Sequence, residues 1–222
     1  MSTSPYTLKE NRYSSHSTIL RLLPGEGQGR SLLDLGCAKG YLSQILAQRG
    51  YEVTAVERTH PQLSGIRFIR ADLDGGLPPL GEQFDYVLVA DLLEHLRDPA
   101  ALLKEIRTAL KPNGRVLLSL PNSGNLYFRL VVLAGRFPKQ DKGLFDRTHI
   151  HFFTWRGWLD LLEQAHYEVR LAIPTAIPIG LTLPRWDHSA PIRAAESLSY
   201  LLARLRKQLF AYQFVVEAVA NQ

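Results

Sequence analysis

The chain has 222 residues, of which 45% are hydrophobic and 21% charged, which is ordinary for a soluble globular domain. A single cysteine, Cys37, excludes an internal disulfide and a cysteine-rich zinc site. The net charge of +5 comes without a dense Lys/Arg run interleaved with aromatic residues, so no nucleic-acid partner is expected. The polar first residues and the lack of an apolar run of ~18 residues lead us to expect a cytoplasmic location.

Short apolar strands alternate with helical patterns, and this order predicts an α/β fold with a mostly parallel sheet in one domain, residues 1–222. The expected strands cover residues 31–35, 51–56, 66–69, 84–90, 115–120, 167–172 and 210–219. The expected helices cover residues 15–23 and 41–49, a segment that Pro99 opens and a segment that Thr154 caps. Residues 111–114, Lys-Pro-Asn-Gly, are expected to form a turn before the fifth strand.

Two insertions, at about 121–153 and 174–208, exceed this minimal pattern. Both follow late strands, where a parallel sheet presents loops beside its ligand crevice, so both are candidates for substrate recognition. The second is expected to end in an amphipathic helix. The first contains the apolar stretch 126–134, for which three interpretations stand: a lid over the site, a surface that meets a lipid tail or bilayer, and a buried helix, the simplest of the three.

A glycine-bearing turn, Asp34-Leu35-Gly36-Cys37-Ala38-Lys39-Gly40, lies between the first strand and the next helix. Small residues at positions 36, 38 and 40 let the backbone turn sharply and approach a ligand at the helix N-terminus. A dinucleotide fold would show G-x-G-x-x-G and hold a pyrophosphate. Here Asp34 would repel a pyrophosphate but suits the positive charges of S-adenosylmethionine (SAM), so the pattern favours SAM over NAD.

With these residues in view, the chain resembles the class I SAM-dependent methyltransferases, strongly over residues 30–120 and loosely elsewhere. The resemblance rests on residues 33–40, Glu57, Ala71-Asp72-Leu73, Phe84-Asp85-Tyr86-Val87 and Asp91-Leu92-Leu93-Glu94-His95. It implies a Rossmann-like fold with a seven-stranded, mostly parallel sheet whose last strand is antiparallel. The one departure is Ala38, where the family more often has glycine.

The resemblance also implies which residues bind the cofactor. The matching positions are Asp34, Gly36, Cys37, Ala38, Gly40, Glu57, Asp72, Leu73, Ala90 and Asp91. The glycine turn would line the methionine portion, Glu57 would accept hydrogen bonds from both ribose hydroxyls, and Asp72 would bind the adenine amino group beside Leu73. Asp91 would face the methionyl amino group or the transfer centre. Asp72 also has a simpler interpretation, as the acid of a turn.

Asp91, Glu94 and His95 form the first catalytic candidate, because the spacing i, i+3, i+4 places them on one face of a helix start. The pattern is similar to the Glu-x-x-Glu-His of ubiquinone-pathway O-methyltransferases, where the triplet binds a divalent ion. The three side chains can therefore hold Mg²⁺ or Mn²⁺, or act as a base with its orienting acid. A purely structural role is the alternative.

The second candidate is the segment 146–154, Asp-Arg-Thr-His-Ile-His-Phe-Phe-Thr. It resembles an element of bacterial methyltransferases that act in cell-surface glycan and lipid-linked sugar synthesis. His149 is the candidate base, Arg147 a clamp for an anionic group, and His151 a further substrate contact. Alternatively, Asp146 and Arg147 pair to hold the loop.

The leading hypothesis is therefore a SAM-dependent methyltransferase that acts on a small molecule, a sugar or a lipid-linked glycan, at oxygen. A second hypothesis is O-methylation of a quinone or other lipid precursor, and a third is a non-catalytic, methyltransferase-like binding subunit. The apolar stretch 126–134 and the basic residues late in the chain add a peripheral membrane contact to these expectations.

Overall fold

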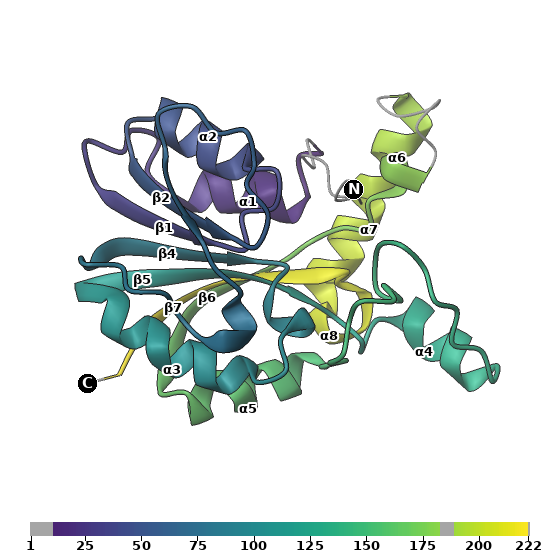
Figure 1. Cartoon of the computed structure of the whole chain (residues 1–222). Coiled ribbons are helices and arrows are strands. Elements are labelled where there is room, and N and C mark those ends of the chain that lie inside the picture. The colour runs from purple at the N-terminus through teal and green to yellow at the C-terminus, as the bar shows by residue number, and fades with distance from the viewer. Residues whose placement is uncertain (1–10, 183–188, 222) are drawn as a thin grey trace.

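The computed structural model describes residues 11–182 and 189–221, which form a sheet with helices on both faces (Figure 1). The seven strands lie in the order β3-β2-β1-β4-β5-β7-β6. Their bounds are β1 Ser31–Leu35, β2 Glu52–Glu57, β3 Arg67–Arg70, β4 Phe84–Ala90, β5 Leu110–Pro121, β6 Tyr167–Pro174 and β7 Gln213–Ala220. The pairs among β1 to β5 are parallel, whereas β7 runs antiparallel to β5 and β6. The predicted fold class is thus confirmed.

Four of the described helices, α1, α3, α4 and α5, begin after a residue whose side chain caps the helix: Ser14, Asp98, Asn125 and Thr154. Asp98 Oδ1 accepts a hydrogen bond from Ala101 N, and Thr154 Oγ1 accepts one from Gly157 N. The helices are α1 Ser15–Leu22, α2 Tyr41–Gln48, α3 Pro99–Ala109, α4 Leu126–Leu133, α5 Trp155–Gln164, α6 Ile179–Thr182, α7 Ala190–Leu205 and α8 Lys207–Phe210. Two 3₁₀ turns, η1 Leu73–Gly75 and η2 Leu93–His95, follow β3 and β4.

Two cores enclose the sheet, because successive strand residues point to opposite faces. Leu32 and Leu88 pack with α1 and α2 on one face. Their sequence neighbours Leu33 and Val87 pack with α3 and α5 on the other face. The central strands β1, β4 and β5 are therefore largely buried on both faces, which explains the apolar runs in their sequences, whereas the edge strands β3 and β6 are partly exposed.

Three expectations differ from the structure. Strand β5 begins at Leu110, five positions before the expected start, and the pairing with β4 shifts register between Phe84 and Tyr86 to accommodate residues 111–114. Strand β7 begins at Gln213, because α8 occupies the preceding residues. The simplest of the three interpretations of 126–134, a buried helix, is wrong: α4 forms, but Phe128 is its one buried side chain and Leu133 is 84% exposed.

Candidate active site

The candidate site lies at the edge of the sheet where the parallel strands end. The glycine turn follows β1, Glu57 ends β2, and Asp91 follows β4. Gln213 begins β7 at this same edge, because β7 runs in the opposite direction and pairs there with Pro121 at the end of β5. Open parallel sheets bind their ligands at this edge.

The glycine turn adopts a backbone that explains its small residues. Gly36, Ala38 and Gly40 all have left-handed φ values, of 71°, 50° and 74°. Glycine adopts this region freely, whereas Ala38 does so at a cost in free energy. The backbone N–H of Ala38 donates to Glu57 Oε2 at 3.0 Å, which ties the turn to the end of β2. The structure thus brings the turn and Glu57 together, and their cofactor-binding roles stay predictions.

Asp34 lies beneath this turn, 3% exposed, and its Oδ2 accepts a 2.5 Å hydrogen bond from Ser43 Oγ on α2. Burial raises the pKa of Asp34 from its ordinary value of 3.8 to about 6. The Ser43 hydrogen bond lowers that pKa, and the charge of Glu57 raises it further. Burial also raises the pKa of the Cys37 thiol, so this residue stays a neutral thiol. The two carboxylates create a negative potential that suits a cationic ligand.

Asp72 forms the turn contact that its simpler interpretation predicts, because its Oδ1 accepts from Asp74 N at 3.1 Å. It caps η1, and Leu73 lies in the core with 6% of its surface exposed. The turn role is therefore present in the structure, and the adenine role of these two residues stays a prediction.

Asp91 occupies a strained position directly after Ala90, at the end of β4. Its φ of 52° is left-handed, a conformation that non-glycine residues adopt rarely and often at functional sites. Its Oδ1 accepts hydrogen bonds from Ser119 Oγ at 2.5 Å and from Gln213 Nε2 at 2.7 Å. Sequence reasoning missed Ser119 and Gln213, although each is a polar residue beside an apolar run.

The two catalytic candidates predicted separately lie together in the structure. The backbone N–H groups of Ile150 and His151 donate to Glu94 O at 3.0 and 3.2 Å, which fixes the second segment against η2. The His95 and His149 rings meet edge to face, with their centroids 4.7 Å apart. His149 Nε2 lies 3.9 Å from Glu94 Oε1, with both side chains nearly buried. A carboxylate and two imidazoles thus meet where the two segments pack together.

These side chains fit a divalent metal ion in their chemistry and spacing. One ligand atom from each of Glu94, His95 and His149 lies within 4.8 Å of the others. Imidazole nitrogens and a carboxylate oxygen are donors that divalent transition metals accept. His149 therefore joins Glu94 and His95 in this group, whereas the carboxylate of Asp91 is bonded to Ser119 and Gln213.

The rest of the 146–151 segment holds the loop in place. Asp146 is buried, and its Oδ1 accepts from Thr148 N at 2.8 Å and from Thr148 Oγ1 at 2.6 Å. His151 Nε2 lies 2.9 Å from Leu96 O. Arg147 pairs with Asp141 at 2.6 Å, on an exposed part of the loop. The substrate-binding roles of Arg147 and His151 stay predictions.

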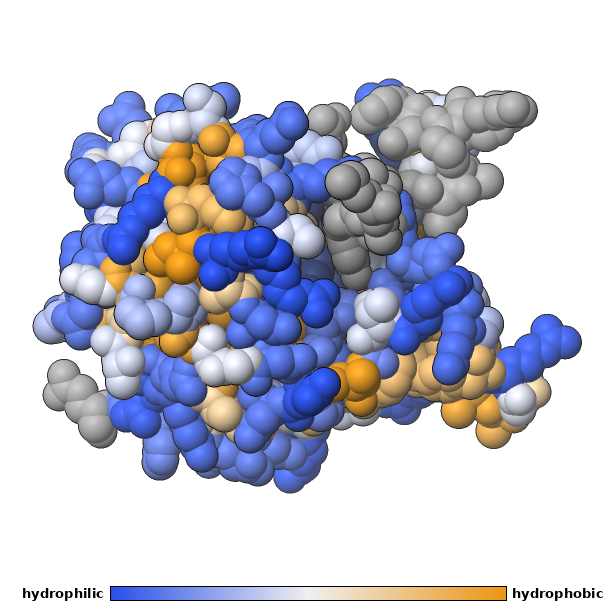
Figure 2. All heavy atoms as spheres, viewed as in Figure 1, coloured by the Kyte–Doolittle hydropathy of each residue, from blue (hydrophilic) through white to orange (hydrophobic). Residues whose placement is uncertain are grey.

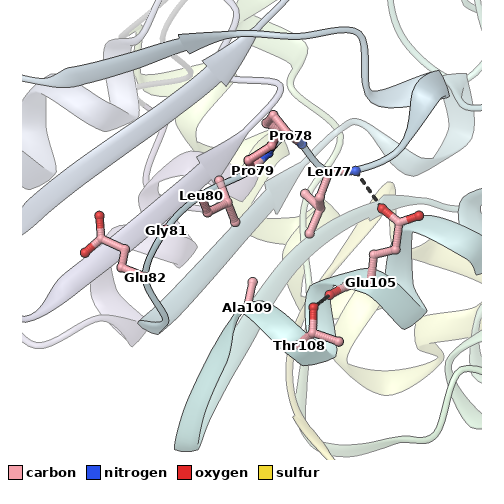
Figure 3. Close-up of a pocket in the computed structure, with 9 residues that line it drawn as sticks. All are labelled: Leu77, Pro78, Pro79, Leu80, Gly81, Glu82, Glu105, Thr108 and Ala109. Atoms are coloured by element: carbon pink, nitrogen blue, oxygen red, sulfur yellow. Dashed lines mark hydrogen bonds between the residues drawn. The ribbon is translucent and has the colours of Figure 1, made fainter.

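A separate hollow lies between the β3–β4 connection and α3, away from these residues (Figure 3). Its lining consists of residues 77–82, Glu105, Thr108 and Ala109, with Glu105 Oε2 accepting from Leu77 N at 2.6 Å. None of the predicted site residues lines it.

Comparison with known families supports the assignment that the fold and site suggest. The model of a family described as "Methyltransferase domain" matches residues 8–172, most of the chain. The chain therefore belongs to the class I SAM-dependent methyltransferases.

Two relatives are named ubiquinone biosynthesis O-methyltransferase. The protein from Stutzerimonas stutzeri (strain A1501) is 32% identical over 125 residues, which are 50% of this chain and 53% of that protein. The protein from Dinoroseobacter shibae (strain DSM 16493 / NCIMB 14021 / DFL 12) is 32% identical over 161 residues, which are 65% of this chain and 62% of that protein. The chain thus spans about half the length of the first relative and less than two thirds of the second.

Solved structures share the fold at low identity. A SAM-dependent methyltransferase from Mesorhizobium loti superposes with a TM-score of 0.62 at 20% identity, covering 92% of this chain and 97% of that one. The 1,6-didemethyltoxoflavin-N1-methyltransferase of Burkholderia thailandensis superposes with a TM-score of 0.60 at 18% identity, covering 96% of this chain and 80% of that one.

Within residues 11–182 and 189–221, no helix is long and apolar enough to cross a membrane.

Proposed function

We propose that this protein transfers the methyl group of SAM to an oxygen of a small-molecule, sugar or lipid-linked glycan acceptor. The observation that carries the proposal is the approach of Glu94 and His149 at the strand edge that also holds the glycine turn. A buried carboxylate beside a histidine is a suitable pair for removing a hydroxyl proton.

The cofactor half of the proposal rests on charge and hydrogen bonding. SAM is cationic at its sulfonium and its amino group, and Asp34 and Glu57 supply negative charge on either side of the turn. The Glu57 carboxylate accepts from Ala38 N and Arg58 N, and its oxygens have further lone pairs for ribose hydroxyls. Asp91, held by Ser119 and Gln213, would face the methionyl amino group.

In the proposed step, the acceptor oxygen forms a bond to the methyl carbon while the methyl–sulfur bond breaks. The electrons of that bond go to sulfur, which leaves as the neutral thioether of S-adenosylhomocysteine. The acceptor proton passes to His149, and the Glu94 carboxylate stabilises the imidazolium that results. Because the sulfonium is a good leaving group, alignment and exclusion of water supply the remaining acceleration.

A divalent ion held by Glu94, His95 and His149 is the second candidate for the acceptor side. When bound, such an ion would lower the pKa of an acceptor hydroxyl. The two roles exclude each other at His149, because a nitrogen that ligates a metal does not accept a proton. If a metal ion assists the reaction, the acceptor we favour is a quinone precursor, the class that the names of the relatives suggest.

Turnover on a panel of acceptors tests the proposal. The purified protein, with SAM, is offered nucleotide sugars, lipid-linked sugars and catechol-type quinone precursors, and S-adenosylhomocysteine is measured. We expect one class to give product that His149→Ala abolishes. SAM binding without turnover on any class would favour a non-catalytic, methyltransferase-like subunit.

A further inference from the structure

Helix α4 and the residues that follow it, together residues 126–139, stand out from the body of the molecule (Figure 1). We call residues 126–139 the α4 surface. Its large apolar side chains are unusually exposed: Leu126 37%, Tyr127 51%, Leu130 54%, Val132 44%, Leu133 84% and Phe137 50%. Figure 2 shows this apolar colouring gathered on the projecting arm. Contiguous exposure of this kind marks an interaction site.

The exposure does not reflect a loosely attached helix. Asn125 caps α4 by accepting from Tyr127 N at 2.9 Å, and its side-chain amide donates to Ala211 O at 2.9 Å. On the inner side, Phe128 stacks on Phe145 with ring centroids 4.5 Å apart. The structure therefore holds α4 firmly while presenting its outer apolar face.

Charge distinguishes between the partners that this face fits. The α4 surface carries Arg129, Arg136 and Lys139 and has no Asp or Glu among residues 126–139. A second copy would present the same three positive charges across a symmetric interface, which disfavours self-association. Apolar side chains interspersed with basic ones are typical of helices that lie in the headgroup region of anionic membranes.

We propose that the α4 surface docks this protein on an anionic lipid bilayer. Leu130 and Leu133 would enter the acyl boundary, while Arg136 and Lys139 contact the headgroups. A helix of eight residues lies on such a surface and does not span it.

The position of the surface also suggests what the acceptor is, a step that rests on the proposed function. Phe137 contacts Phe152 with ring centroids 5.1 Å apart, and the Phe152 and His149 rings are 6.1 Å apart. A short aromatic path thus leads from α4 to the candidate base. An amphipathic acceptor could keep its apolar tail in the bilayer while its polar head reaches His149.

Co-sedimentation with vesicles tests the docking without any turnover, so its result is independent of the proposed function. Phosphatidylcholine vesicles are compared with vesicles that also contain phosphatidylglycerol. We expect the protein to bind the second kind and to be released by added salt. Leu130→Asp with Leu133→Asp should weaken that binding by at least about tenfold, with the circular dichroism spectrum unchanged.

Leu201→Asp on α7 is the matched control, since Leu201 is 55% exposed in a different helix. It should leave vesicle binding unchanged. The proposal is overturned if the wild-type protein does not bind anionic vesicles. It is equally overturned if Leu201→Asp weakens binding as much as the α4 variant, Leu130→Asp with Leu133→Asp. It is also overturned if light scattering shows a dimer that the α4 variant dissociates, because α4 would then bind a second copy.

Discussion

The carboxylate of Glu94 lies 3.9 Å from the imidazole Nε2 of His149, with both side chains nearly buried. Glu94 belongs to the 3₁₀ turn after β4, whereas His149 belongs to the long connection that follows β5. Two backbone hydrogen bonds to Glu94 O, from Ile150 N and His151 N, hold the connection in this position. The fold therefore holds this pair together through backbone hydrogen bonds between the two segments.

His149→Ala should lower turnover by about 100-fold or more while leaving SAM affinity nearly unchanged, because the residue acts on the acceptor proton. Steady-state kinetics together with calorimetry check this split. His149→Gln should not restore turnover, since an amide donates and accepts hydrogen bonds but does not take up a proton. Equal losses of SAM binding and turnover would instead assign His149 a structural role.

If a metal ion assists the reaction, activity should disappear in excess chelator and return with Mg²⁺ or Mn²⁺. Metal binding by Glu94, His95 and His149 would withdraw His149 from proton transfer. The alanine variants of these three residues should then lose metal affinity together, as measured by calorimetry, while Asp91→Asn keeps it. Full activity in excess chelator would rule out the metal role and retain the mechanism in which His149 acts as the base.

Asp34→Asn should stabilise the protein without cofactor at pH 8 and have little effect at pH 4. The folded-state pKa of Asp34, about 6, lies above its ordinary value of 3.8, so the native state binds this proton more tightly. The stability that the folded protein gains from this tighter proton binding is fully present below about pH 4 and is lost as the pH rises through about 6. The difference corresponds to about 3 kcal/mol at pH 8, measurable as a change in midpoint of urea unfolding.

The same group should make SAM binding pH-dependent. Protonation of Asp34 removes a negative charge beneath the turn, so SAM affinity should fall as pH drops below about 6. Asp34→Asn should abolish that dependence. The range from pH 5 to pH 8 extends about one pH unit or more on either side of this pKa. A wild-type SAM affinity that stays constant over this range would contradict a role for the Asp34 charge in SAM binding.

Ala38→Gly should raise the free energy of unfolding by about 0.5–1 kcal/mol. The variant removes the cost of an alanine at a left-handed φ of 50°, and the greater freedom of glycine in the unfolded chain offsets part of that gain. Chemical denaturation measures the change, and SAM affinity should stay within about twofold. Ala38→Val is the opposing control, because a branched side chain tolerates this φ poorly and should destabilise the protein.

The cofactor turn and the sheet could be predicted from the sequence because their signals are local. Strand periodicity, the small residues at 36, 38 and 40, and the caps Asp98 and Thr154 each act within a few residues. The approach of His149 to Glu94 could not be predicted, since it depends on how the connection after β5 packs. An apolar run such as 126–134 has the same sequence pattern in a buried helix and in an exposed one, which is why the simplest interpretation, a buried helix, was wrong.

Isothermal titration with SAM, S-adenosylhomocysteine and NAD tests the central claim most directly, because it asks whether the glycine turn and Glu57 form a SAM site. We expect the first two ligands to bind and NAD not to bind. Glu57→Ala should weaken SAM binding by about 1–3 kcal/mol, the range for a lost hydrogen bond to a charged group, while Glu82→Ala, at a carboxylate lining the separate hollow, should not. Binding of NAD without binding of SAM would contradict the account.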